Sequence, residues 1–465
     1  MNWNFQNTYT NLPSIYYSKV KPNNFDNPKL ILFNEELANE LNLKVNYNEK
    51  EICDFLLGKG LDNNEFYSQA YAGHQFGHFT ILGDGRAVLL GEHINNDNKR
   101  YDIQLKGCGQ TPYSRNGDGK ATLGPMIREY IVSEAMSNLQ IPSTRALAVI
   151  TTGEKVLREK LEPGAILVRV AISHIRVGTF QFGSLLKNVK EFESLINYTI
   201  ERLYPEIKDN KNKYLIFFKK VCDSQINLII NWMRVGFIHG VMNTDNTSLS
   251  GETIDFGPCA FMDNYNPKTV FSSIDKMGRY SFENQFKITL WNLARFAETF
   301  LHLINTNENS AIKIIEEILE EKKEKFNEAW LVMMNKKLSL DINNNNNNNN
   351  EIIKEFLDLM HIHKLDYTNT FLDLEKNRLD MKIFKNWFCK YNLIKSKKHN
   401  DINPYIIPRN HILEKVIKES YKGDFSNLLE FNKVLSSPYK ENNIIKKYMH
   451  PPNEQEKVFQ TFCGT

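Results

Sequence analysis

The chain has 465 residues, and its 58 lysines and arginines nearly balance 55 aspartates and glutamates, for a formal net charge of +3. That balance argues against a dedicated nucleic-acid-binding protein, which concentrates basic residues. Hydrophobic residues make up 41% of the chain and aromatic residues 12%, enough to bury a large core. Because the length exceeds the roughly 250 residues that one core usually sustains, we expect two or three lobes.

No segment resembles a targeting or membrane signal. No run approaches the ~18 consecutive apolar residues of a spanning helix. The first residues, MNWNFQNTYTNLPSIYYSKV, have neither an apolar signal core nor an Arg-rich presequence. We therefore expect a cytoplasmic protein. The six cysteines lack any C-x-x-C pairing, which is typical of reduced thiols rather than of a disulfide scaffold or a zinc site.

The first part of the chain predicts strands around one helix. Tyr71–Glu92, YAGHQFGHFTILGDGRAVLLGE, favours a hairpin around a Gly-Asp-Gly turn. Tyr101–Lys106 alternates like a strand and leads into GCGQTPYSRNGDG, which is too rich in Gly, Pro and Ser for regular structure. Pro125 suits a first helical position, and apolar residues then recur every fourth position, which predicts a helix over PMIREYIVSEAMSNL. Further strands are expected at Thr144–Thr151 and Ala165–Ala171.

Helical periodicity dominates the remaining sequence. The pattern therefore predicts an α+β fold, with a strand-rich N-terminal lobe at 1–180 and a mainly helical C-terminal lobe at 181–465. An unbroken run of asparagines fills 343–350 and cannot bury apolar area, so we expect a flexible loop there.

The segment Phe237–Asp263, FIHGVMNTDNTSLSGETIDFGPCAFMD, carries the strongest chemical pattern. In phosphate-transfer enzymes of the protein-kinase type, a loop supplies an acid and a metal-binding Asn, and a downstream Asp-Phe-Gly supplies a second metal ligand. Asn246 lies seven positions after His239, as that Asn does, and Asp255 begins the Asp-Phe-Gly. Both offer the hard oxygen ligands that Mg²⁺ prefers. Alternatively, the tripeptide is a chance occurrence and Asp245-Asn246 forms an Asx turn.

Upstream residues strengthen the first interpretation. Lys106 ends a predicted strand and Glu129 lies on the following helix, as do the phosphate-contacting lysine and its carboxylate partner in a kinase-like lobe. A lone Lys and Glu would indicate only a weak surface ion pair. The Gly-rich segment, the strand Lys, the helix Glu, the Asp-Asn loop and Asp-Phe-Gly nevertheless occur in the expected order, which favours a nucleotide site.

One departure bears on the reaction. A kinase places its catalytic Asp two residues after the loop His, but that position is Val241 here, and the nearest acid is Asp245. In addition, four basic residues accompany the Gly-rich loops and the stretch RVAISHIR: Arg86, Lys120, Arg169 and Arg176. Extra guanidinium groups suggest phosphates held in an unusual place, although any one of them could instead pair with a surface acid.

Ten segments together resemble the selenoprotein O (SelO, YdiU-type) family of kinase-like protein adenylyltransferases. They are FQNTYTNLPSIYYSKVKP, YAGHQFGHFT, LGDGRAVLLGE, DIQLKGCGQTPYSRNGDGKA, IREYIVSEAM, IPSTRALAV, HIRVGTFQF, HGVMNTDN, IDFGPCAFMD and GRYSFENQ. These motifs are long and specific, and they cover most of the first 300 residues. The resemblance implies a protein-kinase-like bilobal fold whose ATP lies inverted, so that the α-phosphate is presented for attack.

The reaction implied by the resemblance is transfer of AMP from ATP to a Ser, Thr or Tyr hydroxyl of a protein, with release of pyrophosphate. Asp245 would accept the proton, Asn246 and Asp255 would bind Mg²⁺ or Mn²⁺, and Glu129 would orient Lys106. The nucleotide-binding positions implied by the family motifs are Gly83, Gly85, Arg86, Lys106, Asp118, Gly119, Arg169, Arg176 and Asp255. Transfer of UMP is a further expectation for bacterial members. We expect a monomer whose partners are ATP and protein substrates, without nucleic acid or membrane.

Two features fit the family less closely. Eukaryotic members tend to be mitochondrial, but this sequence begins almost directly at the family motif. Members also tend to carry a Cys or selenocysteine near the C-terminus that pairs with a Cys after Asp-Phe-Gly. Cys463 has the first location, and Cys259 lies in the second segment without clearly matching its position, so the resemblance raises a redox pair as a hypothesis beside two free thiols.

Two other functions remain open from the sequence. A kinase would transfer the γ-phosphate, which Val241 at the usual acid position disfavours. A catalytically inactive pseudokinase scaffold would bind nucleotide without transfer, but it would not need Asp245, Asn246 and Asp255 together.

Overall fold

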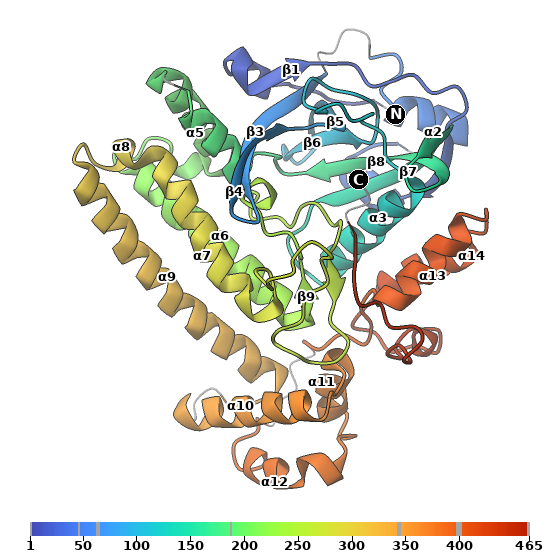
Figure 1. Ribbon diagram of the computed structural model, residues 1–465, viewed down its shortest axis with the longest axis vertical. Helices are drawn as coiled ribbons and strands as arrows, with labels where there is room; N and C mark the ends of the chain where they lie inside the picture. The colour runs from blue at the N-terminus through green and yellow to red at the C-terminus, as the bar shows by residue number, and fades with distance from the viewer. Residues whose placement is uncertain are drawn as a thin grey trace.

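The computed structural model describes residues 2–44, 47–61, 66–186, 188–341, 346–396 and 402–462. An antiparallel sheet occupies the N-terminal part, and helices make up most of the rest (Figure 1). The strands of the sheet are β1 (Tyr17–Lys19), β2 (Lys29–Phe33), β3 (Tyr67–Gln75), β4 (His78–Gly83), β5 (Ala87–Ile94), β6 (Arg100–Lys106), β7 (Arg145–Leu157) and β8 (Leu161–Ala171). Their order is β1-β3-β5-β6-β8-β7-β2, and β4 pairs with β3 alone.

Both faces of the sheet are covered, and apolar residues of strand β8 pack on each of them. On β8, Ile166 and Val168 pack with helices α1 (Glu35–Glu40) and α2 (Glu49–Leu56). The alternate residue Leu167 packs on the opposite face with helix α3 (Leu123–Asn138). Since successive side chains of a strand point to opposite faces, the N-terminal part forms three layers.

Helices dominate after residue 176 and extend from the sheet in Figure 1. They are α4 (Val177–Ser184), α5 (Val189–Leu203), α6 (Lys213–Val235), α7 (Gln285–Ala297), α8 (Leu301–Ile304), α9 (Glu308–Lys337), α10 (Asn346–Ile362), α11 (Tyr367–Glu375), α12 (Met381–Tyr391), α13 (Asn410–Ser420) and α14 (Ser426–Leu435). Two-residue strands β9 (Phe237–Ile238) and β10 (Ala260–Phe261) flank the Asp-Asn and Asp-Phe-Gly segments. In the described ranges, no helix combines the length and the apolar composition needed to cross a bilayer.

The fold confirms the predicted α+β class, with the antiparallel sheet first and helices later. The strand at Tyr101–Lys106 is β6, and the two later strands are β7 and β8, which are longer than expected. The helix predicted from Pro125 begins earlier, at Leu123. The predicted lobe boundary at 180/181 falls within α4 and stays a prediction.

The hairpin prediction around Gly-Asp-Gly is wrong. The strands that flank this turn, β4 and β5, do not pair with each other. Instead β4 pairs with β3 across Phe76 and Gly77, which both have positive φ and so form a tight turn whose twist suits a hairpin. The sequence YAGHQFGHFT therefore holds the turn, and the Gly-Asp-Gly segment leads the chain from this hairpin back into the sheet.

The polyasparagine prediction is wrong for 346–350, which open helix α10, whereas 343–345 lie outside the described residues. Ile353, Phe356 and Met360 recur on one face of this helix and are fully buried. That apolar face stabilises the helix, and the asparagines continue it toward the N-terminus at a modest cost in helix propensity. Asn349 is itself buried, and its Nδ2 donates to the Asp341 carbonyl at 3.0 Å.

The last described part of the chain returns to the segment that follows Asp-Phe-Gly. The Thr461 N–H donates to the Phe271 carbonyl at 2.8 Å, and the Thr461 hydroxyl donates to the Pro258 carbonyl. Ser272 pairs with Thr461 as a parallel bridge. This segment therefore obtains part of its hydrogen bonding from residues about two hundred positions later.

A buried arginine joins the same segment to the C-terminal helices. Arg409, only 1% exposed, contacts the Asp263 carboxylate at 2.7 Å and both oxygens of Asp366 at 2.9 and 3.0 Å. Asp366 is also the N-cap of α11. Two acids from separate elements thus share one cation.

We expect Arg409→Leu to lower the free energy of unfolding by about 3–5 kcal/mol, because it leaves two largely buried carboxylates without their cation. Calorimetric unfolding should show a lower midpoint. The control is Arg378→Leu, which removes an ion pair with Asp373 at an exposed site and should cost about 0–1 kcal/mol. Equal midpoints for the two variants would contradict the prediction.

Candidate active site

The Asp255 carboxylate lies among three cationic side chains. Its Oδ1 contacts Lys106 Nζ at 2.7 Å and Arg169 Nη2 at 2.5 Å, and its Oδ2 contacts Arg176 Nη1 at 3.4 Å. Burial alone would raise the pKa of Asp255, but Arg169, Lys106 and Arg176 hold it well below its usual range. Asp255 has a φ of 64°, a left-handed conformation that Asp tolerates better than most residues. The Asp-Phe-Gly acid is therefore ionised and fixed by the sheet and by α4.

Glu129 contacts two of these cations, Lys106 and Arg169. It projects from α3, and its Oε2 contacts Lys106 Nζ at 2.7 Å while its Oε1 accepts from Arg169 Nε at 3.1 Å. Although burial opposes ionisation, Arg169 and Lys106 lower the pKa of Glu129. The predicted pair of strand lysine and helix glutamate is thus present, and it is buried rather than solvated.

The Asp-Asn loop is short and braced by a histidine. Thr244–Asn246 forms a single 3-10 turn. His239 Nε2 donates to the Ile254 carbonyl at 2.8 Å, and its Nδ1 accepts from the Val241 N–H at 3.3 Å. Burial lowers the pKa of His239, which agrees with a neutral ring that bonds on both sides. His239 thereby fixes the loop to the residue that precedes Asp255.

Asp245 is 6% exposed, and its backbone contacts Arg176 of the cluster around Asp255. Arg176 Nη1 donates to the Asp245 carbonyl at 2.9 Å, and Gln75 Nε2 lies 3.4 Å from Oδ2. Within the described chain, Oδ1 is buried without a hydrogen-bond partner. Burial raises the pKa of Asp245 to about 6. At neutral pH the group is mainly a carboxylate, and its pKa lies near the value that suits a general base.

At three of the predicted glycines, a neighbouring part of the chain lies too close to leave room for a Cβ. A Cβ on Gly83 would collide with the Tyr113 ring, and one on Gly119, whose φ is 64°, would collide with the Gly109 carbonyl. A Cβ on Gly85 would lie 2.8 Å from the Tyr113 carbonyl. The loop after β6 is thus packed directly against the turn between β4 and β5.

Not all predicted residues join the cluster around Asp255. Lys106, Glu129, Arg169, Arg176, Asp245 and Asp255 are connected by direct contacts. Asp118 instead pairs with Arg158 at 2.9 Å, and Lys120 pairs with Glu154 at 2.8 Å. The Arg86 side chain forms no hydrogen bond or ion pair with the described residues.

The structure describes only one of the two cysteines of the hypothetical redox pair. Cys259 is buried, and its Sγ lies 3.3 Å from the Phe256 carbonyl oxygen. Cys463 lies outside the described residues. The pairing of these two cysteines therefore stays a prediction.

Several polar residues of the site were not predicted. Gln104 lies two residues before Lys106 on β6, and its side chain contacts both Arg169 at 3.3 Å and Asp84 at 3.3 Å. Asp84 is buried, and burial raises its pKa. The alternation of Asp102, Gln104 and Lys106 along one strand was the available signal, because every second residue lies on the same face.

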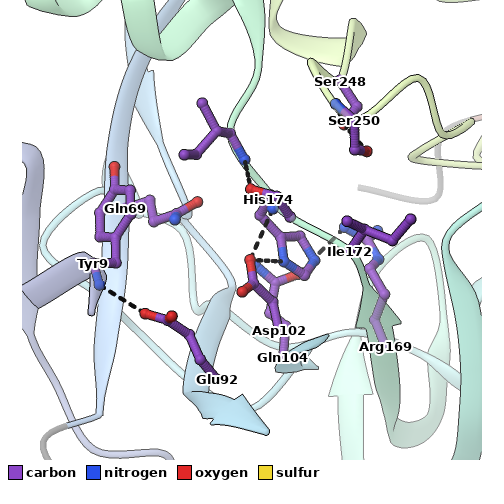
Figure 2. A network of polar contacts seen from close by, with 12 residues as sticks. Tyr9, Gln69, Glu92, Asp102, Gln104, Arg169, Ile172, His174, Ser248 and Ser250 are labelled. Carbon is purple, nitrogen blue, oxygen red and sulfur yellow. Dashed lines mark hydrogen bonds and ion pairs between the residues drawn. The ribbon is translucent and has the colours of Figure 1, made fainter. Parts of the chain in front are cut away.

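A buried network continues this polar row away from the site (Figure 2). Asp102 Oδ2 accepts from the His174 N–H at 2.8 Å and lies 3.2 Å from His174 Nδ1. Its Oδ1 accepts from Arg202 at 2.7 Å, and Arg202 also contacts Glu92 at 2.8 Å. Since His174 lies two residues before Arg176, this network fixes the chain that leads into α4.

The residues Asn246 and Asp255 fit a hard divalent cation by donor type. Asn246 Nδ2 donates to the Val241 carbonyl at 3.0 Å, which leaves its amide oxygen as a ligand atom. Asp255 offers a carboxylate whose pKa is already low. In the described residues, no group of three or more His, Cys, Asp or Glu side chains could hold a metal, so water and nucleotide phosphates would complete the shell.

The chain is similar to known proteins over nearly its whole length. The family model described as protein adenylyltransferase SelO matches residues 1–437. The chain is 48% identical over 481 residues to the protein nucleotidyltransferase YdiU of Pelagibacter ubique, covering 100% of this chain and 99% of that protein. It is 47% identical over 485 residues to the protein of the same name in Clostridium perfringens (strain 13 / Type A), covering 100% and 98%.

These comparisons define an enzyme of the protein nucleotidyltransferase class. The chain belongs to the SelO family of protein adenylyltransferases.

Glu252 is another buried acid, on the segment between Asp245 and Asp255, and its ionisation can be tested. Its carboxylate accepts the Ile172 N–H at 3.0 Å and the Ser250 hydroxyl at 2.7 Å. Burial raises its pKa from 4.5 to about 7. The folded protein therefore prefers the neutral acid, and the stability this contributes is complete below the unfolded pKa and lost as pH rises through about 7.

We expect Glu252→Gln, which stays neutral, to gain stability relative to the wild type as pH rises from 4.5 to 8, by up to ~3 kcal/mol. Thermal unfolding of both proteins across this range measures the difference. A difference that does not change with pH would show that Glu252 ionises normally in the folded protein.

Proposed function

We propose that the chain transfers AMP from ATP to Ser, Thr or Tyr hydroxyls of proteins and releases pyrophosphate. The observation that carries the proposal is the joining of Asp245 to the Asp255 cluster through Arg176, which contacts both residues. One carboxylate, raised in pKa to about 6, thus lies beside a group of cations suited to phosphates. Membership of a family of protein adenylyltransferases supports the same reaction.

In the proposed step, Asp245 accepts the proton of the substrate hydroxyl. The hydroxyl oxygen forms a bond to the α-phosphorus as the bond from that phosphorus to the bridging oxygen breaks, and pyrophosphate leaves. Lys106 and Arg176 neutralise negative charge on the phosphates, while Glu129 keeps Lys106 in place. Such a reaction depends on positioning and charge neutralisation more than on covalent catalysis.

We further infer a protein-kinase-like bilobal fold with an inverted ATP. The order β3-β5-β6-β8-β7, with α3 between β6 and β7 in the chain, supports it, as do Lys106 and Glu129 at the matching places. The lobes would be 1–180 and 181–465. An inverted ATP would present its α-phosphate to Asp245, in keeping with Val241 at the position where a kinase has its acid.

The proposed roles of single residues follow the family motifs. Asn246 and Asp255 would hold Mg²⁺ or Mn²⁺, which when bound neutralises phosphate charge. The nucleotide would be held by Gly83, Gly85, Arg86, Lys106, Asp118, Gly119, Arg169, Arg176 and Asp255. Arg86 and Asp118 would reach it from the loops, outside the present cluster. The relatives are named nucleotidyltransferases, so UTP is a second donor to test.

We expect α-labelled ATP, but not γ-labelled ATP, to leave label on protein in the presence of Mg²⁺ or Mn²⁺. Asp245→Asn should lower the rate of labelling by about 10²-fold or more, because the acceptor of the proton is lost, while ATP binding is kept. The rate is measured with a heat-treated soluble proteome as the hydroxyl source.

The matched control is Asp223→Asn, which removes an acid that pairs with Lys322 and Lys325 on the outer helices. It should label at the wild-type rate. Retention of γ-label would identify a kinase, and ATP binding without either label would identify a pseudokinase scaffold.

A further inference from the structure

The tip of the β3-β4 hairpin contacts three consecutive residues, Asn243–Asp245, of the Asp-Asn loop, which is called the catalytic loop below. The His74 N–H donates to Thr244 Oγ1 at 2.7 Å, and the Phe76 N–H donates to Asn243 Oδ1 at 3.1 Å. A Cβ on Gly73 would collide with the Asp245 carboxylate. The hairpin therefore lies in direct contact with the proposed base.

Gln181, on helix α4, connects this hairpin to the loop. The Thr244 hydroxyl donates to Gln181 Oε1 at 2.6 Å, and Gln181 Nε2 donates to His74 Nδ1 at 2.8 Å. With the His74 N–H on Thr244 Oγ1, these bonds form a closed ring of three residues. Each donor in the ring meets an acceptor, so Gln181 and Thr244 are buried without an unmet polar group in the ring.

Helix α4 also carries the cation nearest to the base. Arg176 is its N-cap, five residues before Gln181, and its guanidinium donates to the Asp245 carbonyl. Gly178, between them, lies so close to the Ala72 carbonyl that a side chain would collide there. The first turn of α4 is thus tied to both the catalytic loop and β3.

We propose that Gln181 is a positioning residue for Asp245: it fixes Thr244, the residue before the base, against α4 and β3. The inference rests on the proposed function of Asp245. Burying an amide that could instead be an apolar residue is costly unless its bonds are made, and here both bonds reach the neighbourhood of the base. A small displacement of a catalytic group, about 1 Å, can lower a rate by about 10²-fold.

The test compares variants that remove or keep single bonds of the ring. Gln181→Leu removes both, whereas Gln181→Glu keeps the acceptor for Thr244. Thr244→Val removes the hydroxyl with little change of shape, and Thr244→Ser keeps it. Gln225→Leu is the control, because Gln225 is also a buried glutamine, and its Nε2 donates to the Ser248 carbonyl at 2.8 Å, outside the ring of Gln181, Thr244 and His74.

We expect Gln181→Leu and Thr244→Val to lower the rate of α-label transfer at saturating ATP by about 10- to 100-fold, with the Kd for ATP unchanged. Thr244→Ser, which keeps the hydroxyl, should retain most of the rate, and Gln181→Glu, which keeps only the bond from Thr244, should lie between the wild type and Gln181→Leu. The double variant Gln181→Leu/Thr244→Val should be no slower than the slower single variant, because both changes break the same ring.

Two results would overturn the inference. One is a Gln181→Leu rate as high as that of Gln225→Leu; the other is a loss of rate matched by an equal weakening of ATP binding, which indicates a structural role only. A wild-type protein that transfers no α-label would overturn the proposed function and this inference with it, whereas an active wild type isolates the result for Gln181.

Discussion

The charge of one carboxylate organises the centre of this molecule. Asp255 brings together Lys106 from the end of β6, Arg169 from β8 and Arg176 from the start of α4. Three cations so close together would repel one another in a buried site, and Glu129 and Asp255 are the acids that make their assembly stable. Among these five groups the cations outnumber the acids, so the cluster keeps an attraction for phosphate.

The register of the sheet places residues of this cluster side by side. Gln104 on β6 faces Arg169 on β8 as a paired residue, and Lys106 follows two positions later on the same face. Helix α3 packs against β7 and β8 through apolar residues, and this packing fixes the position of Glu129 relative to the sheet. The polar centre is therefore placed by apolar packing on both sides of the strands.

The sequence predicted those residues of the site that belong to motifs in a recognisable order along the chain. Lys106, Glu129 and Asp255 could be found because a strand, a helix and a tripeptide motif each mark one of them. Gln181 and Thr244 could not, because their roles depend on contacts between segments far apart in the chain. Asp118 and Arg86 show the converse limit: their motif is specific, but a loop can place a side chain beside a different partner, as Arg158 is for Asp118.

Element types were easier to predict than their connections. Period-two and period-four patterns located β6, β7, β8 and α3, but the pairing of β4 depended on the Phe76-Gly77 turn, where a bulky residue with positive φ gives little signal. The helix at 346–350 depended on the apolar face that follows it. Local composition therefore misjudged both segments where tertiary packing decided the backbone.

The contact between Thr461 and Pro258 links distant parts of the chain, 203 residues apart. During synthesis, the segment after Asp255 emerges long before the residue that completes its hydrogen bonding. At the ribosomal rate of about 5–20 residues per second, that interval lasts roughly 10–40 s. The nascent protein thus passes through a period in which its sheet and helices can fold while the segment after Asp-Phe-Gly still lacks its bonds from Thr461.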